Sequence, residues 1–151
     1  MSDLRIDTIG EDDLAELLPL MRGYSDFYEV DPPDDALLAL ARALIADPER
    51  EGVQFIARAG EGSAVGFATV YWMWSTSSAA RIGVMNDLFV AVDARGTGVG
   101  EALIARCLEL VRERGAASLA WQTAPDNRAA QSLYDRIGGV REQWLDYHLE
   151  P

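Results

Sequence analysis

A glycine-rich run is the part of this chain whose residue types are best suited to binding an anion. It reads Arg95-Gly96-Thr97-Gly98-Val99-Gly100. A short stretch of β-formers precedes it, and apolar residues recur at helical spacing after it, as far as Val111. Helix starts offer unpaired N–H groups, and glycines let a ligand approach the backbone closely. The pattern predicts a phosphate or pyrophosphate site, although a simple tight turn would use the same glycines.

Two familiar phosphate-binding loops do not fit this run. A P-loop needs Gly-Lys-Ser/Thr, and the dinucleotide fingerprint needs a third glycine where Glu101 stands. Together with the strand before it and Leu103 after it, the run resembles the acetyl-CoA motif of the GNAT family of N-acetyltransferases. The resemblance implies an N-acetyltransferase with acetyl-CoA as co-substrate. The residues it places on CoA are Leu88, Phe89, Val90, Arg95, Gly96, Thr97, Gly98, Val99 and Gly100.

Acetyl transfer to an amine needs a base, an oxyanion donor and an acid for the departing thiolate. Tyr134 is the candidate acid, because a phenol with a pKa of about 10 can protonate a thiolate. The run from Asn127 to Tyr134 is similar to the family's second motif, which implies that the tyrosine faces the CoA sulfur and the asparagine binds the pantetheine arm. From the residues alone, Tyr134 could instead pack on the sheet, and Asn127 could be only a helix cap.

Asp87 is the candidate on the amine side, because it brings a charge into an otherwise apolar strand. An ammonium group would offset the cost of burying it, and Asp87 could orient the amine or accept its proton. Alternatively, Asp87 lies at the solvated end of the strand and pairs with arginine or water. The sequence from Asn86 onward most resembles the diamine and thialysine branch, which has Glu-Asp here. Because Asn86 cannot act as a base, the proton passes to Asp87, a water chain or bulk solvent.

The acceptor pocket and the oxyanion site are predicted mainly by the resemblance. The family commonly shapes its acceptor site around the first two helices, which makes Tyr24, Tyr28 and Glu29 candidates for its wall. The resemblance also implies a bulge that frees backbone N–H groups near residues 88–90. We expect a small, cationic primary amine as acceptor. An amino acid, an antibiotic, a protein N-terminus or a non-catalytic acyl-CoA-binding module stay open as alternatives.

Charge and composition limit the partners. The 151 residues carry a formal charge of −12, and residues 1–52 hold 14 Asp and Glu against 4 Arg. This field repels nucleic acid and anionic membranes and favours a cationic substrate, although it could serve solubility alone. No apolar run approaches the roughly 20 residues of a membrane span, and no signal peptide is visible, so we expect a cytoplasmic protein. The resemblance makes a homodimer possible.

Cys107 and His148 are each the single residue of their type. Neither has a partner at metal-ligand spacing, so we expect no metal site. Cys107 shares the apolar face of the helix after the glycine run, which predicts a buried, inert thiol.

The chain predicts one domain, residues 1–151, in the order β-α-α-β-β-β-α-β-α-β. This is a mixed α/β sheet with helices on both faces, and the order also resembles the GNAT fold. The strand after the crossover helix should lie parallel to the strand before the glycine run. The expected strands are residues 4–9, 53–59, 64–74, 80–92, 118–123 and 140–149. Four helices are expected. The first follows Gly10–Asp13 and ends near Gly23, the second runs from Asp34 or Asp35 to about Asp47, and the last two span residues 99–114 and 127–137.

Overall fold

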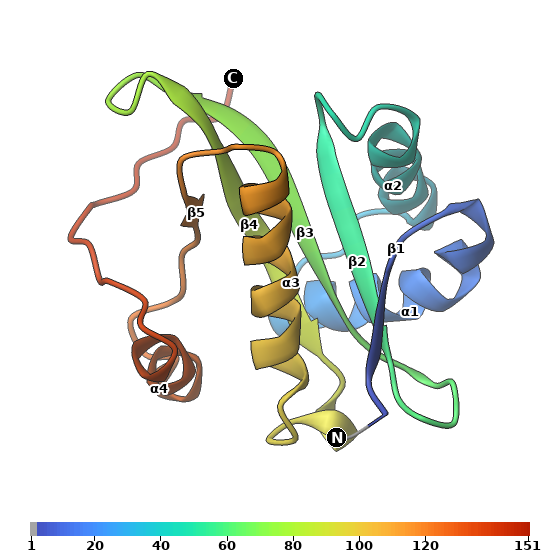
Figure 1. The fold of residues 1–151 in the computed structure, drawn as a ribbon. Helices are drawn as coiled ribbons and strands as arrows, with labels where there is room; N and C mark the ends of the chain where they lie inside the picture. Colours follow the sequence, from blue (N-terminus) through green and yellow to red (C-terminus); the bar gives the residue numbers. More distant parts are fainter. Residues whose placement is uncertain (1–2) are drawn as a thin grey trace.

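A five-stranded mixed sheet forms the centre of the computed structural model, which describes residues 3–151 (Figure 1). The strand order is β1-β2-β3-β4-β5; neighbours among β1 to β4 are antiparallel, and β5 is parallel to β4. The mixed α/β class is therefore confirmed. The strands are β1 Arg5–Thr8, β2 Gly52–Arg58, β3 Ala64–Ser75, β4 Ala80–Val90 and β5 Leu119–Ala120. The helices are α1 Leu14–Phe27, α2 Asp34–Ala46, α3 Val99–Glu113 and α4 Arg128–Arg136, with 3₁₀ turns η1 Glu11–Asp13 and η2 Val92–Ala94.

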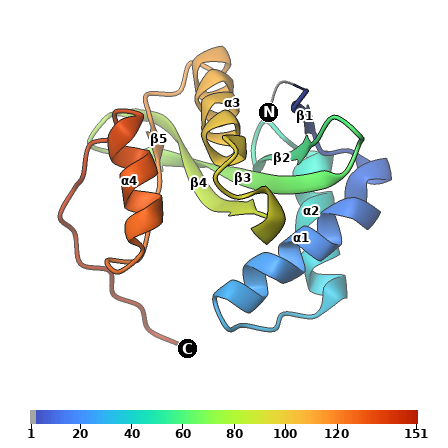
Figure 2. The same cartoon turned by 90° about the horizontal axis from the view of Figure 1, so that it is seen from below.

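Helices cover both faces of the sheet, as expected. Figure 2 shows α3 on one face, α1 and α2 on the other, and α4 beyond the β5 edge. Alternate residues of a strand point to opposite faces. Phe55 accordingly packs with the α3 cluster, while its neighbour Ile56 packs with the α1–α2 cluster. Among residues 3–151, no helix is long and apolar enough to cross a membrane.

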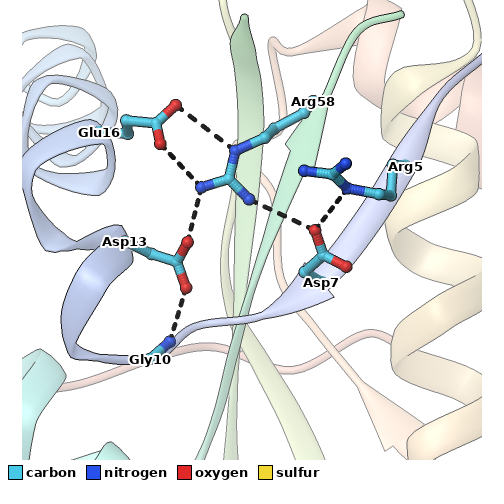
Figure 3. A network of polar contacts seen from close by, with 6 residues as sticks. All are labelled: Arg5, Asp7, Gly10, Asp13, Glu16 and Arg58. Atoms are coloured by element: carbon cyan, nitrogen blue, oxygen red, sulfur yellow. Dashed lines mark hydrogen bonds and ion pairs between the residues drawn. The ribbon is translucent and has the colours of Figure 1, made fainter. Parts of the chain in front are cut away.

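Arg58 ties β2 to β1, η1 and α1 through a network of carboxylates (Figure 3). Its buried guanidinium donates to Asp13 Oδ1 at 2.6 Å, to Glu16 Oε1 at 2.9 Å and to Asp7 Oδ2 at 3.4 Å. Although partial burial alone would raise it, hydrogen bonds from the Gly10 N–H and Arg58 hold the pKa of Asp13 below its ordinary value. The buried cation is therefore paired on all sides, as burial requires.

Helix α1 is longer than predicted, and Gly23 does not end it. A Cβ at Gly23 would lie 2.6 Å from Cζ of Phe89 on β4. Gly23 therefore permits a close approach between helix and sheet, and the predicted helix end at this residue is wrong. The extra turn carries Tyr24 over the end of β4.

The predicted strand 140–149 is wrong for this structure, and the strand predicted at 118–123 is only two residues long. A strand exists only through hydrogen bonds to a neighbour, and apolar alternation alone cannot supply that neighbour. β5 pairs with β4 only at Leu119 and Ala120, opposite Gly83 and Val84. Beyond these pairs the two strands separate, and residues 140–149 pair with neither.

We predict that Arg58→Met lowers the free energy of unfolding by about 2–4 kcal/mol. The substitution leaves the carboxylates of Asp7, Asp13 and Glu16 without their shared cation. Because these carboxylates are partly exposed, water screens their repulsion and limits the loss. Urea unfolding measures the loss. The matched control is Arg5→Met, because Arg5 bonds Asp7 at the surface and should cost much less. Equal losses in the two variants would contradict the role given to Arg58.

Candidate active site

The separation of β4 and β5 opens a cavity of about 460 Å³. This volume lies within the range of small-molecule and cofactor sites, about 300–1,000 Å³. Its walls come from the end of α1, the end of β4, the glycine loop, the chain after β5, and α4. The lining includes Tyr24, Tyr28, Asn86, Leu88, Phe89, Val90, Arg95, Gly96, Gly98, Val99, Gly100, Trp121, Gln122, Thr123, Asn127 and Tyr134.

Two backbone N–H groups of β4 face this opening. The N–H of Ala91 donates to the Val65 carbonyl, on the β3 side, at 2.8 Å. Because N–H directions alternate along an antiparallel strand, those of Leu88 and Val90 point to the other side, toward β5. β5 pairs only with Gly83 and Val84. Leu88 and Val90 therefore offer donors with no strand partner among residues 3–151.

A β-bulge occurs in β4, the strand before the glycine loop, as the resemblance implied. Thr69 is opposite Asp87 and Val70 is opposite Met85, so Asn86 is the extra residue. Beyond the bulge, residues 88–90 pair regularly with β3. The bulge changes which face each side chain meets. Met85 packs with the α3 cluster, whereas Asp87 interacts with Tyr24 of α1.

The glycine loop adopts a backbone that other residues rarely take. Gly96 has φ +76° and Gly98 has φ +93°, and no heavy atom lies within 4 Å of a Cβ built on either. The first helical bond of α3 runs from the Ala102 N–H to the Gly98 carbonyl. The N–H groups of Val99 and Gly100 therefore have no partner within the helix and lie at the cavity. This backbone can hold an anion.

Arg95 and Thr97 both support the loop. Arg95 Nε donates to the Val90 carbonyl at 2.9 Å, and its guanidinium lies 5.7 Å from the centre of the Phe89 ring. Thr97 donates its hydroxyl to the Ala94 carbonyl, and its side chain does not line the cavity. Arg95 thus adds positive charge beside the loop, while Thr97 shapes it.

Helix α4 brings Asn127 and Tyr134 to the opposite wall. Asn127 caps the helix, since its Oδ1 accepts from the Ala130 N–H at 3.3 Å. The Tyr134 ring packs edge-on against Trp121, with 5.3 Å between ring centres. Burial, and then the nearby Tyr28, raise the pKa of Tyr134, so its phenol stays protonated at neutral pH. Tyr134 can therefore donate a proton into the cavity.

Asp87 lies just behind the cavity wall. It is 8% exposed and does not line the cavity, whereas Asn86 and Tyr24 do. The Asn86 amide donates to Asp87 Oδ1 at 2.9 Å. Burial, and then the Asp87 charge, raise the pKa of Tyr24 and of Tyr71. The carboxylate thus acts on the cavity through Tyr24 and Asn86.

Most of the predicted site residues line the cavity, and besides Asp87 and Thr97 there are two further differences. Glu29 is exposed beyond the end of α1 and does not line the cavity. Trp121, by contrast, contributes to the wall and was not predicted. Parallel neighbouring strands end at the same edge of a sheet, so its position next to the β4 end could have indicated it. Among residues 3–151, no group of three His, Cys, Asp or Glu side chains could hold a metal ion.

Comparison with known proteins points to one family. Residues 17–139 match the model of the acetyltransferase (GNAT) family. An uncharacterized N-acetyltransferase of Bacillus subtilis is 34% identical over 83% of this chain and 83% of its own length. The thialysine N-epsilon-acetyltransferase of Caenorhabditis elegans is 26% identical over 99% of this chain and 94% of its own length.

Solved structures agree with this result. A probable acetyltransferase superposes with a TM-score of 0.84 at 28% identity and covers 97% of both chains. The aminoglycoside N-acetyltransferase AAC(6')-Iy in complex with CoA has a TM-score of 0.84 at 22% identity, covering 97% of this chain and 94% of its own. At that identity the likeness shows the fold alone.

We predict that Cys107 does not react with iodoacetamide in the native protein. Its side chain is fully buried in α3, and burial raises the pKa of the thiol to about 12. Intact-mass spectrometry after treatment at pH 8 should show no adduct, whereas urea-unfolded protein should gain one. Rapid labelling of the native protein would contradict the burial of Cys107 and would make its thiol a candidate nucleophile.

Proposed function

The chain belongs to the acetyltransferase (GNAT) family, and on that premise we propose that it transfers the acetyl group of acetyl-CoA to the primary amine of a small, cationic molecule by direct attack. One observation carries the proposal. The separation of β4 and β5 opens a single cavity that has the anion-binding loop on one side and the protonated Tyr134 on the other.

The loop and the β4 edge fit the two halves of CoA. The open space at Gly96 and Gly98, with the free N–H groups at the start of α3, suits a pyrophosphate, and Arg95 adds charge. The pantetheine amides can bond the unpaired edge of β4 as an added strand would. Because Asn127 Oδ1 is used by the helix cap, its Nδ2 is left to donate to a pantetheine carbonyl.

The chemical roles follow from the same geometry. As the amine nitrogen forms its bond to the thioester carbon, negative charge develops on the carbonyl oxygen, where the Leu88 N–H can donate. Breakage of the carbon–sulfur bond releases a thiolate, which takes the phenolic proton of Tyr134. The acceptor ammonium loses one proton before the attack, which frees its lone pair, and the tetrahedral adduct loses a second; both protons pass by way of water toward Asp87 or to solvent. Tyr134 then recovers a proton from solvent.

The acceptor side favours a cationic amine. Tyr24 and Tyr28 stand 4.8 Å apart between ring centres at this wall, and aromatic faces attract ammonium groups. Asp87 adds a negative charge beside Tyr24. Relatives are named for acceptors as different as thialysine and aminoglycosides. We therefore test the acceptor class with a panel of diamines, amino acids, aminoglycosides and short peptides, following thiol release from acetyl-CoA. Turnover with peptides but not with small cationic amines would overturn the acceptor assignment.

We predict that Tyr134→Phe lowers kcat by about 100-fold and leaves the KM for acetyl-CoA nearly unchanged. The substitution removes the proton donor but keeps the ring against Trp121. Because the pKa of Tyr134 is raised, the wild-type rate should not fall from loss of this acid below about pH 10. Tyr147→Phe is the matched control, since Tyr147 is exposed outside the cavity. An unchanged kcat in Tyr134→Phe would rule out its role as acid.

We predict that Gly98→Ala weakens CoA binding by about tenfold, equivalent to about 1.4 kcal/mol. The new methyl group occupies the space through which an anion approaches the loop, and the left-handed backbone adds strain. Calorimetric titration with CoA measures the affinity.

Gly62→Ala is the control for strain. Gly62 has φ +99° and equally open space, but it lies in the turn between β2 and β3. Both variants should lose similar thermal stability, and only Gly98→Ala should lose affinity. If Gly98→Ala and Gly62→Ala bound CoA with equal affinity, the assignment of the pyrophosphate to this loop would be wrong.

A further inference from the structure

A second, smaller pocket lies where α2 meets the end of β1 and the start of β2 (Figure 1). We call it the α2 pocket. Its volume is about 60 Å³, and none of its lining residues lines the large cavity. A site for one water molecule needs about 10–15 Å³ of such space, so the α2 pocket has room for about four to six non-hydrogen atoms.

Gln54 of β2 lines the α2 pocket with half of its amide group unpaired. The residue is 2% exposed, and its Nε2 donates to Thr69 Oγ1 at 3.1 Å. Its Oε1 is buried and has no hydrogen-bond partner among residues 3–151. Turning the amide by 180° would place Oε1 against Thr69 and leave Nε2 unpaired instead. An unpaired buried acceptor costs free energy, which a ligand that donates a hydrogen bond would offset.

The surroundings of this oxygen are apolar. Gln54 alternates with Phe55, which packs with the α3 cluster, so the Gln54 side chain lies on the opposite face, under α2. Thr8 is the other lining residue with a polar side chain, but it pairs with Phe55, and its hydroxyl therefore lies on the α3 side. Among the described residues that line the α2 pocket, none is charged. The pocket thus offers one polar side-chain group, an acceptor.

This chemistry selects the class of ligand. A charged group would be buried without a partner, and an amide would bring a carbonyl as well as an N–H, of which only the N–H has a partner here. A buried water molecule typically makes two to four hydrogen bonds, whereas the side chains of this pocket supply one. A hydroxyl group on a short aliphatic chain gives its hydrogen to the free oxygen and lays the chain against apolar walls.

We propose that the α2 pocket binds a short aliphatic alcohol of about four to six non-hydrogen atoms, whose hydroxyl donates to Gln54 Oε1. Ala41 and Leu44 of α2 are buried beside it, whereas Ile45 and Pro48 are only half-buried, which places the entrance at the end of α2. The proposal is independent of acetyl transfer, because binding at this pocket requires neither CoA nor an acceptor amine.

Titration of the isotopically labelled full chain with 1-butanol, followed by the chemical shifts of its amides, tests the site. We expect saturable shifts at residues 41–45 and 52–54, with a Kd in the millimolar range, because so small a ligand makes few contacts. No saturable shift at these residues, or shifts confined to the lining of the large cavity, would overturn the proposal.

Diethyl ether is the matched control ligand, because it is an isomer of 1-butanol that has no O–H to donate. We expect it to bind the wild-type protein at least about fivefold more weakly than 1-butanol does. Equal binding of the two isomers would show that the free oxygen of Gln54 is served by water only, and would overturn the proposal.

Gln54→Met tests the oxygen itself, since it keeps the length of the side chain and removes the acceptor. The variant should bind 1-butanol about fivefold more weakly and should no longer distinguish it from diethyl ether. Gln143→Met is the control, because Gln143 is exposed and does not line the pocket. Thermal melting checks that both variants fold, and the comparison of the two isomers in the wild-type protein needs no variant. Unchanged affinity for 1-butanol in a folded Gln54→Met protein would overturn the assignment to Gln54.

Discussion

The structure depends on one constraint, which is that β4 and β5 pair at only two positions before they separate. Among residues 3–151, the separation leaves the N–H groups of Leu88 and Val90 without a strand partner. It also opens the cavity between the start of α3 and the face of α4. Neighbouring parallel strands normally hydrogen-bond along their whole length. Because β5 does not do so here, these two N–H groups are available to a ligand that takes the place of a strand. The glycine loop and Tyr134 meet across this opening as walls of one cavity.

Two smaller features shape the wall at which the acceptor amine is proposed to bind. The bulge at Asn86 turns Asp87 away from the α3 core, and Gly23 lets α1 pass close to Phe89 and carry Tyr24 onward. Burying a carboxylate is costly unless it is hydrogen-bonded, and Asn86 supplies such a bond. The charge of Asp87 is thereby held next to the cavity without open contact with solvent. This arrangement provides a negative field at the wall where an ammonium group would arrive.

The sequence predicted those features that local patterns determine. The glycine loop between strand and helix, the Asn127 cap and the order of the first nine elements are all encoded by neighbouring residues. The features it missed depend on residues far away in the chain. Glycine is common at helix ends, but Gly23 is needed because Phe89 of β4 lies so close to it. Only the resemblance implied the bulge in β4, because its place at Asn86 depends on register with β3, and residues 140–149 have the alternation of a strand but pair with no strand among residues 3–151.

Hydrogen exchange of the intact protein, with and without saturating CoA, tests the central claim most directly. If the ligand lies along the opening between β4 and β5, amides of residues 88–90 and 96–100 should exchange more slowly with CoA, while β1 and β2 remain unchanged. Protection confined to other elements, or no protection despite measurable CoA binding, would contradict the account of the site.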